Sequence, residues 1–147
     1  MEISLKTTKW QEAIDITELV EKVIERESGK AALLFNPSTT SALTINEGYD
    51  KAVMRDVLNI IDELTPRLDF EHHKVLSEDF GISGNPNSKE DFRYREGNSP
   101  AHAKASLIGS SLLIPIKDNK LLLGQYQKIF FLEFDGPKER KIEVSII

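Results

Sequence analysis

Residues 94–109 read Tyr-Arg-Glu-Gly-Asn-Ser-Pro-Ala-His-Ala-Lys-Ala-Ser-Leu-Ile-Gly, and the rest of the chain is organised around this stretch. Its first half is a polar loop interrupted by glycine and proline, and its second half predicts a helix. Asn98 or Ser99 can serve as the N-cap, and Pro100 suits the first helical position, where a backbone N–H has no partner within the helix. The alanines and other apolar residues that follow favour helix, and Gly109 can end it.

His102 lies in the first turn of this expected helix. The positive end of the helix dipole favours the neutral imidazole, which is the form that accepts a proton or binds a metal. Free backbone N–H groups at the same helix start can form, together with His102, a pocket for an anion or a metal. The other interpretation is that His102 only packs or caps. Lys104 follows two residues later, on another face of the helix.

The composition is that of an ordinary globular protein. The chain has 147 residues, of which 39% are apolar and 29% are charged, and its formal net charge is -5. This length suits one domain with a core, and no block of lysine and arginine points to nucleic acid as a partner. There is no cysteine, so neither disulfides nor thiolate metal ligands are expected. No apolar run approaches the ~20 residues that span a membrane, and the N-terminus lacks a signal peptide's apolar stretch. We therefore expect a cytoplasmic protein with no membrane partner.

Most of the chain alternates between apolar and polar residues, which predicts half-buried strands. Residues 31–35 are continuously apolar and predict a fully buried strand. The last strand ends in two isoleucines, so we expect it to be paired or covered, within the chain or by another subunit. About eight short strands and three helices result, an α+β fold dominated by antiparallel sheet. The expected strands are residues 2–9, 13–16, 31–35, 41–46, 110–116, 121–123, 129–134 and 141–147.

Two helices are expected besides the one that carries His102. Thr17 can cap a helix over residues 18–27, and Asp50 can cap a helix over residues 51–64. Asp56 lies off the apolar stripe of this second helix and is expected at the surface. The expected buried stripe consists of Val53, Val57, Ile60, Ile61 and Leu64.

Residues 67–99 are longer than an ordinary connection and are rich in loop-forming Gly, Asn, Ser and Pro. Such a segment in a compact domain is usually either a functional lid or a mobile insert.

All three histidines, His72, His73 and His102, bracket this loop. Without cysteine, a metal site would need histidine together with Asp or Glu, which suits zinc or a harder divalent ion. His72 and His73 cannot both point inward from an extended strand, because neighbouring side chains face opposite ways. At most one of them is therefore expected to join His102. The alternative is that the pair belongs to a solvated loop.

Polar residues also follow the strand at residues 41–46. Asn46, Glu47 and Asp50 stand at its end, beside a helix start, where carboxylates can bind a cation or act as acid and base. Asp50 is in addition expected to cap the helix. Glu133 stands in an apolar strand and is either a solvent-facing residue or a buried carboxylate with a partner.

Five blocks of the sequence, in order over nearly the whole chain, resemble the YjbQ-like family, also called the secondary thiamine-phosphate synthase family. The first block reads Pro-Ser-Thr-Thr-Ser-Ala-Leu-Thr-Ile-Asn-Glu over residues 37–47 and is followed by Asp50. The fourth is Asn-Ser-Pro-Ala-His-Ala-Lys-Ala-Ser-Leu over residues 98–107. The fifth begins with Gly-Gln-Tyr-Gln and ends with Glu-Phe-Asp-Gly-Pro, over residues 124–137. The second and third are Val53 with Asp56, and Phe70-Glu71-His72.

Two departures from the family's pattern stand out. Before Thr39 the family usually has a histidine, where this chain has Ser38, and this puts any role of that side chain in question. Between His72 and Tyr94 relatives are commonly short, and we expect a loop insertion over residues 74–93 that remodels access to the pocket.

The resemblance implies a single domain over residues 1–147 with an antiparallel β-sandwich-like (jelly-roll-like) fold and about three helices, assembled as a homotrimer. It implies the activity of a secondary thiamine-phosphate synthase, which joins hydroxymethylpyrimidine diphosphate to a thiazole phosphate, as a main or a side reaction. The rival interpretations are a non-catalytic trimer that binds a metal or a small anion, and a metal-assisted hydrolase.

The resemblance also implies a site for a small phosphorylated or anionic molecule at a subunit boundary. Lys104 and a cation held by carboxylates would neutralise the diphosphate, and His102 would be an acid/base or a metal ligand. The implied catalytic residues are His102, His72, Lys104, Glu47 and Asp50. The implied substrate-binding residues are Thr39, Thr40, Asn46, Asn98 and Gln127. The implied ligands of a divalent metal, zinc or magnesium, are His72 and His102.

Overall fold

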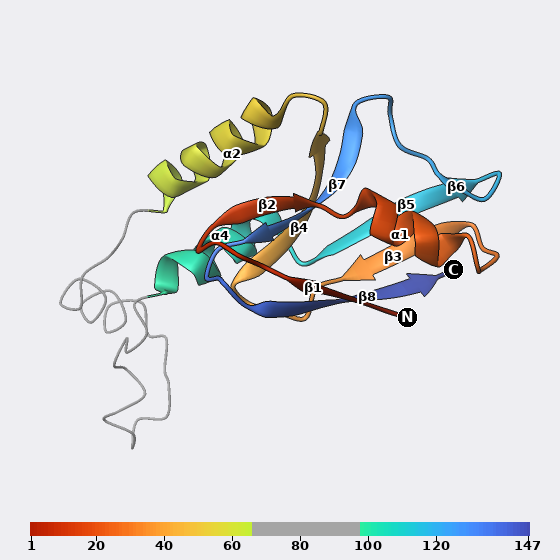
Figure 1. Cartoon of the computed structure of the whole chain (residues 1–147), viewed down its shortest axis with the longest axis horizontal. Helices are drawn as coiled ribbons and strands as arrows, with labels where there is room; N and C mark the ends of the chain where they lie inside the picture. Colours follow the sequence, from red (N-terminus) through yellow and green to blue (C-terminus); the bar gives the residue numbers. More distant parts are fainter. Residues whose placement is uncertain (66–97) are drawn as a thin grey trace, which may run out of the picture.

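Two antiparallel β-sheets pack face to face and curl into a half-barrel, with helices at one end and on one outer side (Figure 1). The computed structural model describes residues 1–65 and 98–147. In these residues it has eight strands and three helices, and the expected α+β, sandwich-like fold is confirmed.

The larger sheet has the strand order β1-β8-β3-β5-β6. Its last strand in sequence lies between two others, because β8 pairs with β1 on one side and with β3 on the other. The expectation that the final isoleucine-ending strand is paired is therefore confirmed within the chain. The strands are β1 (Glu2–Lys6), β3 (Ala31–Phe35), β5 (Ser111–Lys117), β6 (Lys120–Leu121) and β8 (Glu139–Ile146).

The smaller sheet has the order β2-β7-β4, with β2 at Glu12–Asp15, β4 at Ser41–Glu47 and β7 at Gln127–Glu133. The central strand β7 is apolar without alternation because both of its faces are covered. Phe131 points into the core between the sheets, whereas Phe130 and Leu132 point toward the helices on the other side.

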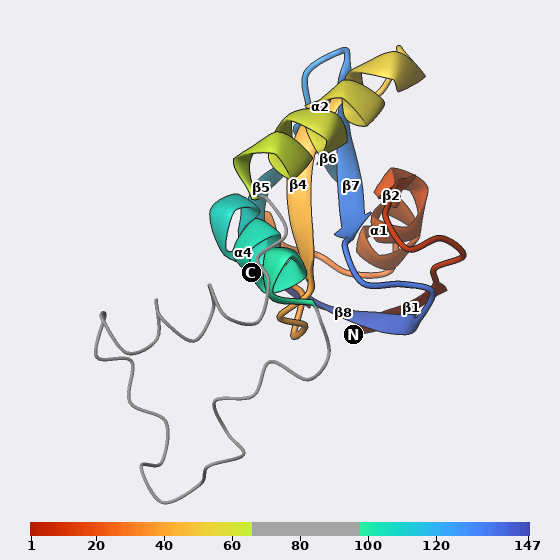
Figure 2. The ribbon, with the colours of Figure 1, turned by 90° about the vertical axis from the view of Figure 1, so that its left-hand side faces the viewer.

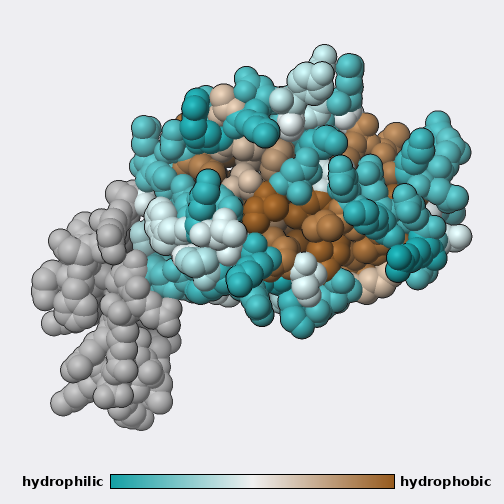
Figure 3. Space-filling model, viewed as in Figure 1, coloured by the Kyte–Doolittle hydropathy of each residue, from teal (hydrophilic) through white to brown (hydrophobic). Residues whose placement is uncertain are grey.

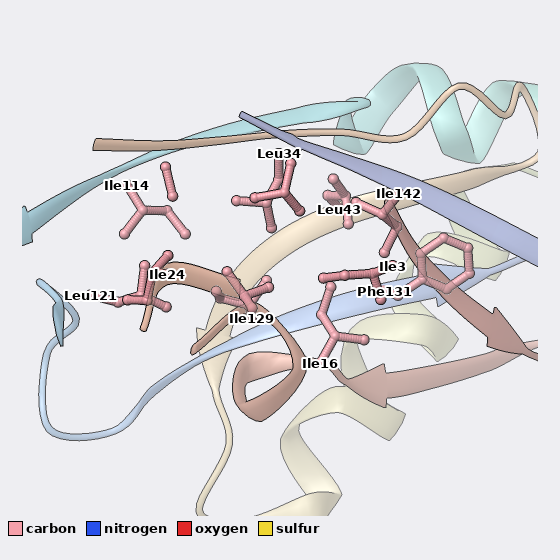
Figure 4. Packing of buried hydrophobic residues seen from close by; sticks show 13 residues of the cluster. Ile3, Ile16, Ile24, Leu34, Leu43, Ile114, Leu121, Ile129, Phe131 and Ile142 are labelled. Carbon is pink, nitrogen blue, oxygen red and sulfur yellow. The ribbon is translucent and has the colours of Figure 1, made fainter. Parts of the chain in front are cut away.

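The main core lies between the two sheets (Figure 4). Each sheet contributes the inward half of its alternating residues, such as Leu34 and Ile142 from the larger sheet and Leu43 and Phe131 from the smaller one. All four are at most 1% exposed, so water is excluded from the whole interface. Burial of these side chains is the principal stabilising term of the fold.

Helix α1 (Thr17–Ile24) fills one end of this core, and α2 (Lys51–Leu64) and α4 (Ser99–Ile108) lie on the opposite side of β4 and β7 (Figure 2). Helix α1 is shorter than expected. Thr17 is its first helical residue and not its N-cap, because its hydroxyl is used elsewhere. It donates to Asp15 Oδ1 at 2.6 Å and accepts the Ile129 N–H at 2.9 Å, which ties the helix start to β7.

The buried stripe of α2 differs from the expected one. Met54 and Ile61 are buried, but Ile60 is 57% exposed and Leu64 is 68% exposed. The helix is rotated so that Met54, together with Val57, packs on the small sheet. This rotation also turns Asp62 toward α4, where it finds a cationic partner. Periodicity alone could not choose between two overlapping apolar stripes.

Candidate functional site

Three segments distant in sequence meet around a pocket of about 450 Å³. They are the loop before β4, the start of α4, and the turn that leads into β8. The structure thus brings together four of the expected site residues, namely Thr39, Thr40, Asn98 and His102, with the basic side chains Lys138, Arg140 and Lys141.

His102 presents its ring to this pocket from the first turn of α4. The residue is exposed, and its imidazole forms no hydrogen bond with any residue in the described part of the chain. The backbone is held, because the His102 carbonyl accepts the Ser106 hydroxyl at 3.0 Å and Pro100 stiffens the helix start. The backbone of His102 is therefore fixed, while its imidazole is left available for a ligand, as an acid/base group requires.

Asn98 and Asp135 form one wall of the pocket. Asn98 Nδ2 donates to Asp135 Oδ2 at 3.2 Å, and Lys138 Nζ forms an ion pair with the same oxygen. Burial raises the pKa of Asp135, but the hydrogen bonds from Lys138 and Asn98 outweigh it and hold the pKa below its ordinary value. Asn98 occupies the N-cap position of α4 without a side-chain capping bond.

Behind the pocket, Glu133 and Arg140 form a buried ion pair. The glutamate side chain is fully buried and the arginine side chain is 10% exposed. Arg140 Nε donates to Glu133 Oε2 at 2.7 Å and Nη2 donates to Oε1 at 2.6 Å, a two-pronged arrangement. Burial raises the pKa of Glu133, but the hydrogen bonds from Arg140 and from the Asp135 N–H outweigh it, so the net pKa lies below the ordinary value.

Arg140, like Lys138 and Lys141, is a residue of this pocket that the sequence did not single out. Its remaining donors reach the loop before β4, because Nη1 donates to Ser38 Oγ at 2.9 Å and Nη2 donates to Thr40 Oγ1 at 3.0 Å. A signal was available, since a glutamate inside an apolar strand needs a cation if it is buried. The structure selects that alternative for Glu133.

Lys104 does not lie in the pocket. Its side chain is only 2% exposed, and Nζ pairs with Asp62 and hydrogen-bonds Gln11 Oε1 at 2.7 Å. The ammonium also stands 5.0 Å from the ring centre of Trp10. Two positions along a helix correspond to a rotation of about 200°, so His102 and Lys104 point to nearly opposite sides. Lys104 makes an internal structural contact in this chain, and its expected role on a diphosphate stays a prediction.

The expected residues Asn46, Glu47, Asp50 and Gln127 form a second group at the far end of β4 and β7. Glu47 accepts the N–H groups of Tyr49 and Asp50 at 2.7 and 2.9 Å, and Asp50 caps α2 by accepting the Ala52 N–H at 2.8 Å. Gln127 lies opposite Glu47 in the sheet. At about 3.3 Å per strand residue, this group is about 20 Å from Thr40, so one chain does not join it to the His102 pocket.

His72, a proposed ligand and catalytic residue, lies outside the described residues, as does the expected insertion at residues 74–93. In residues 1–65 and 98–147, no group of three or more His, Cys, Asp or Glu side chains is placed to hold a metal ion. Over the same residues, no helix has both the length and the apolar character to cross a membrane.

The family model described as "UPF0047 protein YjbQ-like" matches residues 1–147. The chain belongs to the YjbQ-like UPF0047 family. A UPF0047 protein of Archaeoglobus fulgidus is 37% identical over 147 residues, which covers 100% of both chains. The UPF0047 protein YugU of Bacillus subtilis is 36% identical over 147 residues, covering 99% of this chain and 96% of its own. The resemblance seen in the five sequence blocks is thereby confirmed.

Solved structures of this family share the fold. A YjbQ/UPF0047 family protein of Clostridium acetobutylicum, described as an ortholog of YugU, is 42% identical and superimposes with a TM-score of 0.79, covering 100% of this chain and 99% of its own. The protein TT1486 of Thermus thermophilus is 31% identical with a TM-score of 0.78, covering 100% and 99% respectively.

Proposed function

We propose that the chain is a cytoplasmic enzyme of the thiamine-phosphate synthase type, which joins hydroxymethylpyrimidine diphosphate to a thiazole phosphate and releases diphosphate. The observation that carries the proposal is a pocket lined by the cations Lys138, Arg140 and Lys141 and by His102, whose imidazole forms no hydrogen bond with the residues that the structure describes. A pocket of about 450 Å³ is of the size that binds small molecules. The family membership adds to this support through the resemblance described above.

The reaction fits the groups that surround the pocket. The thiazole nitrogen would attack the pyrimidine methylene carbon, forming a C–N bond as the C–O bond to diphosphate breaks. The diphosphate leaves with the electron pair of that bond. His102 would act as the acid that donates a proton to the leaving oxygen, and the basic side chains would offset the charge that develops there. Because Lys104 is buried elsewhere, this charge falls to Lys138, Arg140 and Lys141.

A homotrimer would complete the site. Within one chain, the Glu47 group lies far from the His102 pocket. In a homotrimer, the Glu47 group of a neighbouring copy could lie beside the His102 pocket. Apolar side chains that lack a partner support such an assembly. Leu113 on β5 is 64% exposed and Phe35 on β3 is 45% exposed. In addition, the face of the molecule seen in Figure 3 carries an apolar area that is framed by hydrophilic side chains. Such patches commonly mark contacts between subunits.

A divalent ion, zinc or magnesium, remains part of the proposal, but no step of the reaction is assigned to it. In the described part of the chain, His102 belongs to no group of three or more possible metal ligands, and the Asp135 carboxylate on the same pocket is already paired with Lys138. These residues alone therefore do not make a zinc site. Magnesium bound to the diphosphate itself would supply additional charge neutralisation.

The test is to incubate the purified protein with both substrates and magnesium, and to measure thiamine phosphate by chromatography. We expect turnover in the wild type and a drop of at least about a hundredfold in His102→Ala, the usual cost of losing an acid/base group. Lys22→Ala, an exposed change on α1 outside the pocket, is the control and should keep wild-type turnover.

Two outcomes would replace the proposal by its rivals. Saturable binding of diphosphate without any product would favour a non-catalytic trimer that binds a metal or a small anion. Release of phosphate in the absence of the thiazole substrate would favour a metal-assisted hydrolase.

A further inference from the structure

The hydrogen bonds behind the pocket begin at Glu133. Its carboxylate accepts five of them, two from Arg140, one from the Thr7 hydroxyl, and two from the N–H groups of Phe134 and Asp135. A carboxylate has about four lone-pair directions, so its capacity is filled. Glu133 therefore fixes the plane of the guanidinium and leaves no acceptor of its own for the pocket.

The guanidinium of Arg140, held in this plane, in turn orients two hydroxyl groups. Ser38 Oγ and Thr40 Oγ1 each accept one of its N–H groups, at 2.9 and 3.0 Å. Ser38 Oγ also accepts the Thr40 N–H at 3.2 Å. A hydroxyl that accepts still has its own hydrogen to donate. In the described part of the chain, neither the Ser38 nor the Thr40 hydroxyl hydrogen has an acceptor.

Arg140 itself retains a donor. A guanidinium has five N–H groups, and four are used by Glu133, Ser38 and Thr40. The fifth, on Nη1, has no acceptor among the described residues. The Arg140 side chain is 10% exposed and Thr40 is 6% exposed. Donors that are this well shielded from water are normally satisfied, because an unmade hydrogen bond costs about 1–3 kcal/mol.

We propose that Ser38, Thr40 and Arg140 form a binding site for a phosphoryl group. All three side chains line the same pocket, and their free donors belong to atoms already linked to one another by hydrogen bonds. Three clustered donors with no acceptor among them suit a tetrahedral oxyanion better than a neutral ligand. Lys138 and Lys141 lie on the same lining and add positive charge.

This inference rests on the proposed function, because it concerns the same pocket. It adds which part of the substrate binds at each end of that pocket. The phosphate of a substrate would bind at Ser38, Thr40 and Arg140, and the reacting atoms would lie toward His102. Phosphate binding itself does not depend on turnover. The assignment also gives Ser38 a role in a position where the family usually has a histidine.

The experiment measures the affinity for inorganic phosphate by isothermal titration calorimetry on the full chain. Ser38→Ala and Thr40→Val each remove one donor but leave the Glu133–Arg140 pair in place, so the fold should survive. Because a hydrogen bond to a charged group contributes strongly, each variant should weaken phosphate binding about tenfold or more. Thr40→Ser keeps the hydroxyl and should bind within about threefold of the wild type. Ser106→Ala, an exposed hydroxyl outside the pocket, should leave the affinity unchanged.

Several results would overturn the proposal. These are the absence of saturable phosphate binding, equal binding by Ser38→Ala, Thr40→Val and the wild type, or acetate binding as tightly as phosphate. Failure of the proposed function is distinguishable from these results. Hydroxyl-dependent phosphate binding without thiamine phosphate formation upholds this site and refutes the reaction. If all variants form thiamine phosphate and inorganic phosphate inhibits them equally, the reaction is upheld and this phosphate site is refuted.

Discussion

Lys104 Nζ and Asp62 Oδ1 form an ion pair that joins α4 to α2, although only 2% of the lysine side chain is exposed. The rings of Trp10 and Phe134 stand 5.0 and 5.7 Å from the same ammonium group. Gln11 supplies a further acceptor. Lys104 thus behaves as an internal cation whose partners come from three segments of the chain, and its loss would leave the Asp62 carboxylate and the Gln11 amide oxygen without their cation.

We therefore predict that Asp62→Asn lowers the free energy of unfolding by about 2 kcal/mol, because a charge-assisted hydrogen bond is lost while the lysine stays buried. The comparison is Asp56→Asn on the same helix, where Asp56 pairs with Arg55 and the two side chains are 61% and 70% exposed. That exposed pair should contribute less than about 0.5 kcal/mol. Urea denaturation of both variants measures the difference. Equal midpoints would show that the Lys104 contact does not stabilise the fold.

The Glu133–Arg140 pair predicts a pH dependence of stability. The pKa of Glu133 is depressed in the folded protein, so its ionised form stabilises the fold above the unfolded pKa. That contribution is complete above the unfolded pKa of about 4.3 and is lost as the pH falls through the depressed folded pKa. Glu133→Gln should cost about 3 kcal/mol at pH 7, because Arg140 keeps its charge without a partner. The difference in the free energy of unfolding between the wild type and Glu133→Gln should become smaller toward pH 3.

Denaturant unfolding of both proteins at several pH values checks this. Glu12→Gln is a suitable control, since Glu12 accepts hydrogen bonds only from nearby exposed groups. If the difference in the free energy of unfolding between the wild type and Glu133→Gln stays constant from pH 7 to pH 3, the ionised Glu133 carboxylate is not what stabilises the fold.

The exposed apolar face of the larger sheet predicts self-association. Sedimentation should give a mass of about three times the 16.6 kDa of one chain. Leu113→Glu should dissociate the proposed trimer, because it would bury a charge among apolar side chains in the proposed interface. Lys22→Glu, an exposed change on α1, should leave it intact. A wild type that remains monomeric at micromolar concentration, or a Leu113→Glu trimer, would argue against this surface.

The sequence predicted the elements well where the local signals agreed or one of them was unambiguous. The helix over residues 51–64 has the expected bounds and its expected Asp50 cap, because the capping residue, the period and the following proline agree. The buried strand at residues 31–35 was found because its apolar run is short and uninterrupted. The stripe of α2 was misjudged because the helix carries two overlapping apolar stripes, and the contact between Asp62 and Lys104 on α4 is a property of the folded chain.

The candidate site was predictable in its residue types but not in its grouping. Thr40 and His102 do meet, as expected of two blocks from one pattern. Lys104 shares a motif with His102 but faces the other way, and the Glu47 group lies at the opposite end of β4. Arg140 escaped notice because its importance depends on Glu133, seven residues earlier, whose burial is a property of the folded sheet.

Asp50 allows a structural and a catalytic role to be separated within one side chain. It caps α2 through the Ala52 N–H, and asparagine caps a helix about as well as aspartate does. Asp50→Asn should therefore unfold at the same urea concentration as the wild type, whereas Asp50→Ala should lose about 1 kcal/mol.

Turnover should respond differently from stability. If Asp50 acts by its charge in the completed trimeric site, both Asp50→Asn and Asp50→Ala lower thiamine phosphate formation, although only the second lowers stability. We expect this pattern, because an amide can accept the same N–H but cannot hold a cation or take up a proton as a carboxylate does. An Asp50→Asn protein with wild-type turnover would confine the residue to capping. It would also remove the main reason to expect the far end of β4 in the active site.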